Sequence, residues 1–263
     1  MIRFILAAAL ALAAHAAVAQ VAPAEAVKEL APTGKLRAAI NYGNGVLAQK
    51  GPEGEPRGVT VDLSRELGRR LGVPVELLAF EAAGKAFEAA KQNAVDVLFI
   101  AIDPSRAEVE FTAPYVLIEG TYMVREDSPL KTVEDVDRQG VRVAVGLASA
   151  YDPYLTRSLK HATVVRAARG GCCEMIEMFL ADRLEVVAGV RQQLEGFAKT
   201  QRGLRIMDGR FQVIQQAVGT PKGRPAAAAY LRTFIEEMKA SGFVADALKR
   251  SNQPDAQVAP AGG

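Results

Sequence analysis

The hydrophobic pattern of this chain changes period repeatedly, from the two-residue repeat of strands to the 3.6-residue repeat of helices. In residues 62–71, leucines recur at every fourth position and Gly72 follows, which predicts an amphipathic helix that ends there. The same pattern predicts further helices at residues 85–91, 153–159, 174–182, 226–239 and 244–249. β-like segments alternate with them at residues 36–40, 75–80, 95–101, 116–124, 141–145, 163–166, 184–188 and 211–218. Two successive sets of β-α-β units, each about 90 residues long, indicate an α/β protein with two lobes.

The start of the chain has the three parts of a secretory signal peptide. Arg3 gives a basic start, residues 4–14 are an unbroken apolar run, and residues 17–19 have the small-x-small form that signal peptidase cleaves. We therefore expect a signal peptide over residues 1–19 with cleavage after Ala19, export to the periplasm, and a flexible leader over residues 20–33. No cysteine follows the cleavage site, so a lipid anchor is not expected.

The charges of the chain nearly cancel, because 32 Lys and Arg face 30 Asp and Glu. No long block of one sign occurs, so the electrostatic pattern of a nucleic-acid-binding protein is missing. Beyond the signal peptide, no segment approaches the roughly 18 apolar residues of a membrane span. The full chain is 49% hydrophobic, which is typical of a globular protein, and after removal of the signal peptide it is expected to be a soluble monomer that acts on a small molecule without a cofactor.

Histidine and cysteine are scarce in the mature chain. His161 is the one histidine left after cleavage, which argues against a zinc site of several imidazoles and against a Ser-His-Asp triad. Cys172 and Cys173 are adjacent, and three interpretations stay open for them. They could be free thiols at the start of a helix, a strained vicinal disulfide, or a Cu(I) site with Met175 and Met178, for which core packing is the simpler role.

Four short motifs carry a resemblance to a known family. They are GKLR at residues 34–37, GVTVDL at 58–63, DPSR at 103–106 and FTAPY at 111–115. In this order and spacing they resemble the periplasmic solute-binding proteins of the amino-acid type, family 3, and the last two look like that family's D…TxxR…FSxPY stretch. The resemblance covers roughly residues 34–250.

The resemblance implies a type II periplasmic binding protein-like fold, in which two α/β lobes are joined by two crossover strands and the ligand binds in the cleft between them. The crossovers are expected near residues 119–122 and 214–218. The implied division is lobe one at residues 34–120 plus 217–250, lobe two at 121–216, and a flexible tail at 251–263. The partner of such a protein is the inner-membrane permease of an ABC transporter, which recognises the closed form.

Arg106 is the first candidate binding residue. A guanidinium is a rigid fork that matches a carboxylate with two charge-assisted hydrogen bonds, and in the resembled family the Arg of this motif holds the carboxylate of the ligand. The alternative is a surface arginine paired with Glu108 or Glu110. Asp103 stands where the family commonly has Thr, and it could orient Arg106 or cap the following turn.

Further candidates follow strands of the two predicted lobes, where open α/β sheets bind their ligands. Asn41, Tyr42 and Asn44 come just after residues 36–40, although Asn and Gly also suit a simple turn. Ser149 opens a predicted helix of lobe two, where its hydroxyl could hold an anion or serve only as an N-cap.

The ligand is not expected to be an ordinary zwitterion. Family members that bind α-amino acids usually carry an Asp in lobe two that receives the ammonium group, and here that position falls at Val190 or Arg191. Ala101 also stands where a ligand-binding Ser is common. A carboxylate, a dicarboxylate or an acylated amino acid is therefore expected. If Arg106 and Arg191 both face the cleft, dianions are favoured, and if Arg191 points outward that preference fails.

Two other classes of function are alternatives to a binding protein. Periplasmic cyclohexadienyl dehydratases resemble the same fold, but such an enzyme needs a proton donor in the cleft, and Glu81 and Glu119 are the acids that the order of the chain places nearby. A ligand-sensing domain would need a membrane or signalling segment, which the pattern does not predict. We therefore expect no catalytic activity.

Overall fold

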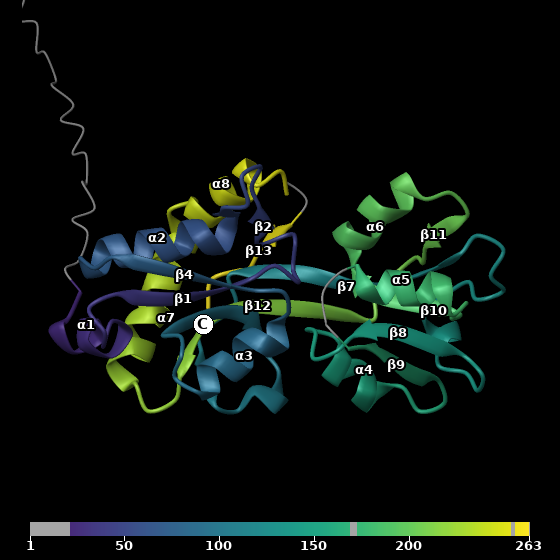
Figure 1. Ribbon diagram of the computed structural model, residues 1–263, viewed down its shortest axis with the longest axis horizontal. Coiled ribbons are helices and arrows are strands. Elements are labelled where there is room, and N and C mark those ends of the chain that lie inside the picture. The colour runs from purple at the N-terminus through teal and green to yellow at the C-terminus, as the bar shows by residue number, and fades with distance from the viewer. Residues whose placement is uncertain (1–21, 169–172, 254–255, 263) are drawn as a thin grey trace, which may run out of the picture.

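The computed structural model describes residues 22–168, 173–253 and 256–262. The predicted signal peptide, its cleavage site and Cys172 lie outside these residues. Figure 1 shows two bodies side by side, each a sheet covered by helices, with long strands running between them. Within the described part of the chain, no helix combines the length and the apolar character needed to cross a membrane.

The first lobe is built on parallel strands. β1 (Leu36–Asn41) lies between β4 (Val75–Phe80) and β5 (Val97–Ala101) and pairs in parallel with both. α2 (Val59–Leu71) and α3 (Ala83–Lys91) cover opposite faces of this sheet (Figure 1). Because the strands are parallel, their carboxyl ends lie at one edge, and the loops that follow them share that edge.

The second lobe repeats this plan. β8 (Arg142–Gly146) lies between β9 (Thr163–Ala167) and β10 (Val186–Val190) and pairs in parallel with both. The helices of this lobe are α4 (Asp152–Ser158), α5 (Glu174–Ala181) and α6 (Arg191–Thr200). The two successive β-α-β sets that the hydrophobic pattern predicts are therefore present.

Two long antiparallel strands join the lobes. β7 (Val116–Arg125) pairs over residues 120–123 with β10 of the second lobe, and β12 (Gln212–Pro221) pairs over residues 216–219 with β5 of the first. They also pair with each other, so one continuous sheet passes through both lobes. The predicted fold class, two α/β lobes joined by two crossover strands, is confirmed, while the exact limits of the lobes stay a prediction.

The leader and tail expectations are wrong for the residues that the structure describes. α1 (Ala24–Leu30) packs against α7 (Pro225–Ala240) and buries Ala26 and Leu30 completely, because these residues share one face of the helix. Near the other end, β13 (Gln257–Val258) pairs with β7. Packing of apolar side chains therefore fixes the first segment to the first lobe, and strand pairing fixes the second.

The remaining elements are short or terminal. They are β2 (Gln49–Lys50), β3 (Pro56–Arg57), β6 (Val109–Phe111), β11 (Leu204–Ile206), α8 (Phe243–Arg250) and the 3-10 helices η1 (Pro104–Arg106) and η2 (Val133–Val136).

Candidate functional site

Arg106 lies between the two lobes and is almost fully buried, with 4% of its surface exposed. It ends η1, just after the buried strand β5, and its guanidinium donates to the carbonyl of Ala101 at 2.6 Å and across the cleft to that of Ala148 at 3.3 Å. Burial lowers the pKa of Arg106 to about 10, with Asp103 opposing the shift, so the group is still charged at neutral pH. The alternative of a surface arginine paired with Glu108 or Glu110 is wrong, because Arg106 is buried and ion-pairs with neither, and Glu110 binds Arg232.

Asp103 has a second role besides the predicted cap. Its carboxylate accepts from the backbone N–H of Ser105 at 2.9 Å, and it also binds Arg157 of α4 at 2.8 Å, so this ion pair joins the two lobes. Burial raises the pKa of Asp103, but the hydrogen bonds from Arg157 and Ser105 outweigh it and hold the pKa below its ordinary value.

A small cavity of about 30 Å³, here called the inner pocket, lies between the lobes. Its lining includes Asn41, Asn44, Ser149, Tyr151, Val190 and Gln216. Three predicted site residues from two lobes therefore meet here. The turn alternative also holds for the asparagines, because Asn41 Oδ1 accepts from Gly43 N–H at 3.0 Å and Asn44 Oδ1 from Val46 N–H at 3.2 Å.

Ser149 combines its two predicted roles. Its hydroxyl accepts from the backbone N–H of Asp152 at 3.2 Å, close to the start of α4, and the residue also lines the inner pocket.

Tyr42 lies outside the cleft. Within the described part of the chain, it lines neither the inner pocket nor the larger cavity of the cleft, and its ring lies 5.2 Å from the ammonium of Lys50. Burial raises the pKa of Tyr42, with Lys50 opposing the shift.

Arg191 does not converge with Arg106, so of the two orientations that the sequence left open for Arg191, the structure has the outward one. Its Nε donates to Glu119 at 2.8 Å, and the guanidinium also donates to the carbonyl of Gly209. These contacts direct Arg191 to a separate surface depression beside the joining strands β7 and β12. The apolar Val190 lines the inner pocket instead. The preference for dianions that depended on Arg191 therefore fails.

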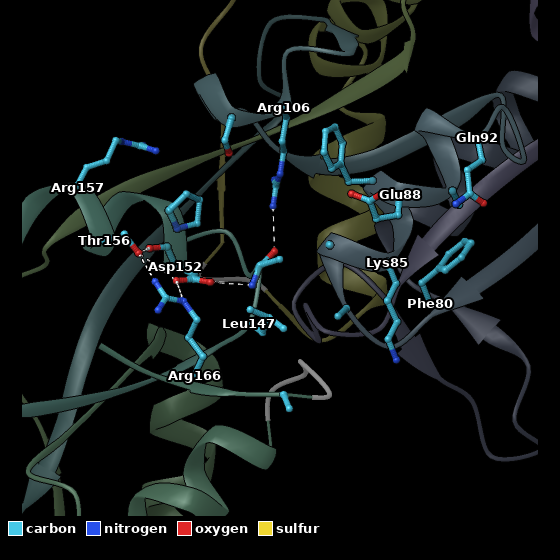
Figure 2. A pocket seen from close by; sticks show the side chains of 18 residues that line it. Phe80, Lys85, Glu88, Gln92, Arg106, Leu147, Asp152, Thr156, Arg157 and Arg166 are labelled. Carbon is cyan, nitrogen blue, oxygen red and sulfur yellow. Dashed lines mark hydrogen bonds and ion pairs between the residues drawn. The ribbon is translucent and has the colours of Figure 1, made fainter. Parts of the chain in front are cut away.

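A larger cavity of about 800 Å³, here called the outer groove, continues the cleft toward the surface. Its lining includes Phe80, Lys85 and Phe87 from the first lobe, Leu147 and Pro153 from the second, and Arg106. Figure 2 shows Arg106 pointing toward the loop that carries Leu147, with Lys85 and Phe80 on the facing side. Leu147 and Ala82 line both cavities and so lie between them.

Asp152 is a buried residue of the groove that the sequence analysis did not identify. Its carboxylate accepts from the backbone N–H of Ala148 and from Arg166 Nε, both at 2.9 Å (Figure 2). These bonds hold the loop after β8, in which Ala148 has the left-handed φ of 54° that non-glycine residues seldom adopt. The Asp-Pro start of a helix after a strand was the available signal.

The lobes are in contact in this structure. A Cβ atom added to Gly84 of α3 would lie 2.5 Å from the Cβ of Ala148, so the first lobe approaches the second as closely as a glycine permits. The Asp103–Arg157 ion pair and the Arg106–Ala148 hydrogen bond cross the same boundary. The cleft is therefore closed.

No group of three or more His, Cys, Asp or Glu side chains within the described ranges could hold a metal ion. Met175 packs in the core and its sulfur accepts from the Tyr151 hydroxyl at 2.8 Å, in accord with the packing interpretation. Cys173 is exposed, and Cys172 is outside the described residues, so the pairing of the two cysteines stays open.

The family model for bacterial extracellular solute-binding proteins, family 3, matches residues 38–251. No curated protein sequence matches the chain. A mutant of ArgBP from T. maritima superposes with a TM-score of 0.74 at 22% identity, covering 86% of this chain and 99% of that one. The solute receptor for L-cysteine of Neisseria gonorrhoeae gives 0.75 at 20% identity, covering 87% and 94%.

An ancestral amino-acid-binding protein, described as a precursor of cyclohexadienyl dehydratase, also superposes, with a TM-score of 0.71 at 20% identity and 85% and 97% coverage. At these identities the three structures establish the fold that the chain shares with them.

Proposed function

Because the chain belongs to the bacterial extracellular solute-binding proteins, family 3, we propose that it is the substrate-binding component of an ABC transporter for amino acids or related carboxylates. The single observation that carries the ligand class is Arg106, a buried guanidinium between the lobes whose hydrogen bonds within the described residues all go to backbone carbonyls. Its role is to bind the carboxylate of the solute.

A buried charge without a counterion is costly, because carbonyl dipoles replace only part of its lost hydration. A carboxylate in reach of Arg106 would form charge-assisted hydrogen bonds, which are about twice as strong as neutral ones. Since the carbonyl of Ala148 already accepts from this guanidinium across the cleft, a solute bound here would contact both lobes. Binding would therefore favour the closed form.

The partners and location follow from the same proposal. The closed lobes would present one surface to an inner-membrane permease, and a periplasmic monomer would carry the solute to it. Several similar structures are named for amino-acid ligands, among them arginine and cysteine, which supports an amino-acid-like carboxylate.

A thermal-shift screen of the mature protein against amino acids and organic acids tests the proposal. A ligand at 100 times its dissociation constant should stabilise the native state by roughly 2.7 kcal/mol. In small-angle scattering, the radius of gyration with a stabilising ligand should then be no larger than that of the ligand-free protein. A screen in which no carboxylate stabilises the protein would contradict the proposed ligand class.

The dehydratase alternative has less support from the site. Glu81 binds Lys50 at 2.9 Å, Glu119 binds Arg191 and Arg210, and neither lines the inner pocket or the outer groove among the described residues. Asp152 lines the groove, but Arg166 and a backbone N–H hold its carboxylate. A stabilising ligand that is consumed on incubation would favour the enzyme.

A further inference from the structure

We propose that the solute is an amphipathic carboxylate whose acyl or aromatic body occupies the outer groove while its carboxylate binds Arg106. This inference rests on the proposed function and specifies its substrate class. A free zwitterionic amino acid confined to the inner pocket would then be a poor ligand.

The sizes of the two cavities are the first argument. The inner pocket, at about 30 Å³, offers the room of about one water molecule. The outer groove, at about 800 Å³, lies within the range of roughly 300 to 1,000 Å³ that small-molecule sites occupy. Arg106 lines the outer groove and not the inner pocket, so a carboxylate held by it has its free space on the groove side.

The apolar lining is the second argument. Phe80 and Phe87 of the first lobe and Leu147 and Pro153 of the second all line the groove. Leu147 is 43% exposed and is one of the two large exposed hydrophobic residues in the described part of the chain. An apolar body in the groove would cover these side chains from both lobes at once, which would couple its binding to closure.

The charges of the lining are the third argument, because the acidic side chains at the groove already have cationic partners. Both buried carboxylates near the groove are engaged, Asp103 by Arg157 and Asp152 by Arg166. No acidic side chain from the described residues lines the inner pocket.

Two cations that line the groove, by contrast, have no paired carboxylate within the described residues. Glu88 and Lys85 both line the groove, but Glu88 pairs with Lys91, while Lys85 has no carboxylate partner in the part of the chain that the structure describes. With Arg106 also lacking one, the lining favours an anion whose nitrogen is acylated or absent.

Calorimetry with leucine, N-acetylleucine and N-hexanoylleucine tests this, since the three probes share a carboxylate and a side chain. Acetylation removes the ammonium charge, so N-acetylleucine should bind more tightly than leucine. Each further methylene that the groove buries should tighten binding by about fourfold. N-hexanoylleucine should therefore bind at least about tenfold more tightly than N-acetylleucine.

The variant Leu147→Ser should remove most of the gain from the hexanoyl chain, so that N-hexanoylleucine loses more affinity than N-acetylleucine does. Val213→Ser is the matched control, because Val213 is 40% exposed and lies outside the groove. It should leave both affinities unchanged. Thermal melting without ligand verifies that the two variants fold alike.

The two levels of the proposal fail differently. Leucine binding more tightly than its acylated forms, a flat series, or an unchanged hexanoyl gain in Leu147→Ser would overturn the groove assignment and leave solute binding intact. If no probe binds, and the broader screen of amino acids and organic acids also fails, the proposed function fails with it.

Discussion

Arg106 and Arg191 each follow the carboxyl end of a buried strand, one in each lobe, and their surroundings differ. Arg191 has Glu119 at 2.8 Å and Glu195 at 3.6 Å, and its side chain is 24% exposed. Arg106 is only 4% exposed and its guanidinium reaches backbone carbonyls alone among the described residues. The more deeply buried cation is thus the one with no carboxylate paired directly to it within the described residues.

The difference separates a structural arginine from one that can bind a ligand. The carboxylate of Glu119 balances the charge of Arg191 within the chain, so an incoming anion would have to compete with it. The charge of Arg106 is desolvated and only partly compensated by dipoles, so an anion gains the full strength of a charge-assisted pair. Position after a strand is common to both residues, and the counterion distinguishes them.

The largest expected effect comes from removing each arginine in turn. Arg106→Ala should weaken binding of the tightest carboxylate from the screen by roughly 2 to 5 kcal/mol, because the bound anion would lose its partner in a buried site. Arg191→Ala is the matched control and should change affinity by less than about 0.5 kcal/mol. Calorimetry on both variants measures these changes in affinity. Equal losses of affinity would show that the two arginines do not differ in their role in binding.

A second experiment places a carboxylate where the second lobe presents an apolar residue. Val190→Asp should weaken binding of N-acetylleucine and strengthen that of leucine, by roughly 1 to 3 kcal/mol each, because the new charge repels an anion and receives an ammonium. Val190→Asn has nearly the same volume without the charge and should not reverse the preference. Titration of both ligands against both variants gives the answer, and a reversal in the Asn variant would point to shape.

The sequence predicted the fold well because the period of the hydrophobic side chains is a local property. α2 ends at Gly72, whose φ of 69° is left-handed, as the predicted helix does. α6 was missed because Leu194 is its one buried residue, too weak a pattern to read. α1 was missed because its apolar face is buried only by packing against α7, which lies about 200 residues further on in the chain.

The site was predictable where a motif follows a strand and unpredictable where distant residues decide. Arg106 follows β5 closely, so its place at the sheet edge could be inferred. The direction of Arg191 depends on Glu119, 72 residues earlier, and no local pattern carries that information. The outer groove likewise forms only when α3 and α4 of different lobes come together.

Arg157 offers a smaller and sharper test, since it pairs with Asp103 across the cleft. Arg157→Gln should weaken ligand binding by about 1 kcal/mol or less, because its side chain is 50% exposed and screening limits the pair. Arg142→Gln is the control, because Arg142 is 43% exposed and pairs with Glu185 inside one lobe. Both variants should melt alike, and calorimetry should show a loss only for Arg157→Gln. A similar loss for Arg142→Gln would mean that the ion pair across the cleft has no special effect.

The smallest expected effect concerns Glu119, the counterion of Arg191. Hydrogen bonds from Arg210 and Arg191 hold the pKa of Glu119 below its ordinary value, against the opposing effect of burial. A depressed folded-state pKa means that the stabilisation is fully present above the unfolded pKa, near 4.3, and is lost as the pH falls through the folded pKa. Because the side chain is 36% exposed, Glu119→Gln should cost about 1 kcal/mol or less at pH 7.

Urea unfolding of wild type and Glu119→Gln at pH 7 and pH 3 measures this effect of Glu119. The difference in unfolding free energy between the two proteins should shrink at pH 3, because Glu119 is then closer to protonation in the wild type. Ligand affinity at pH 7 should be the same for both, since the network around Glu119 lies outside the cleft cavities. A variant that loses ligand affinity without losing stability would place Arg191 in binding after all and remove the contrast with Arg106.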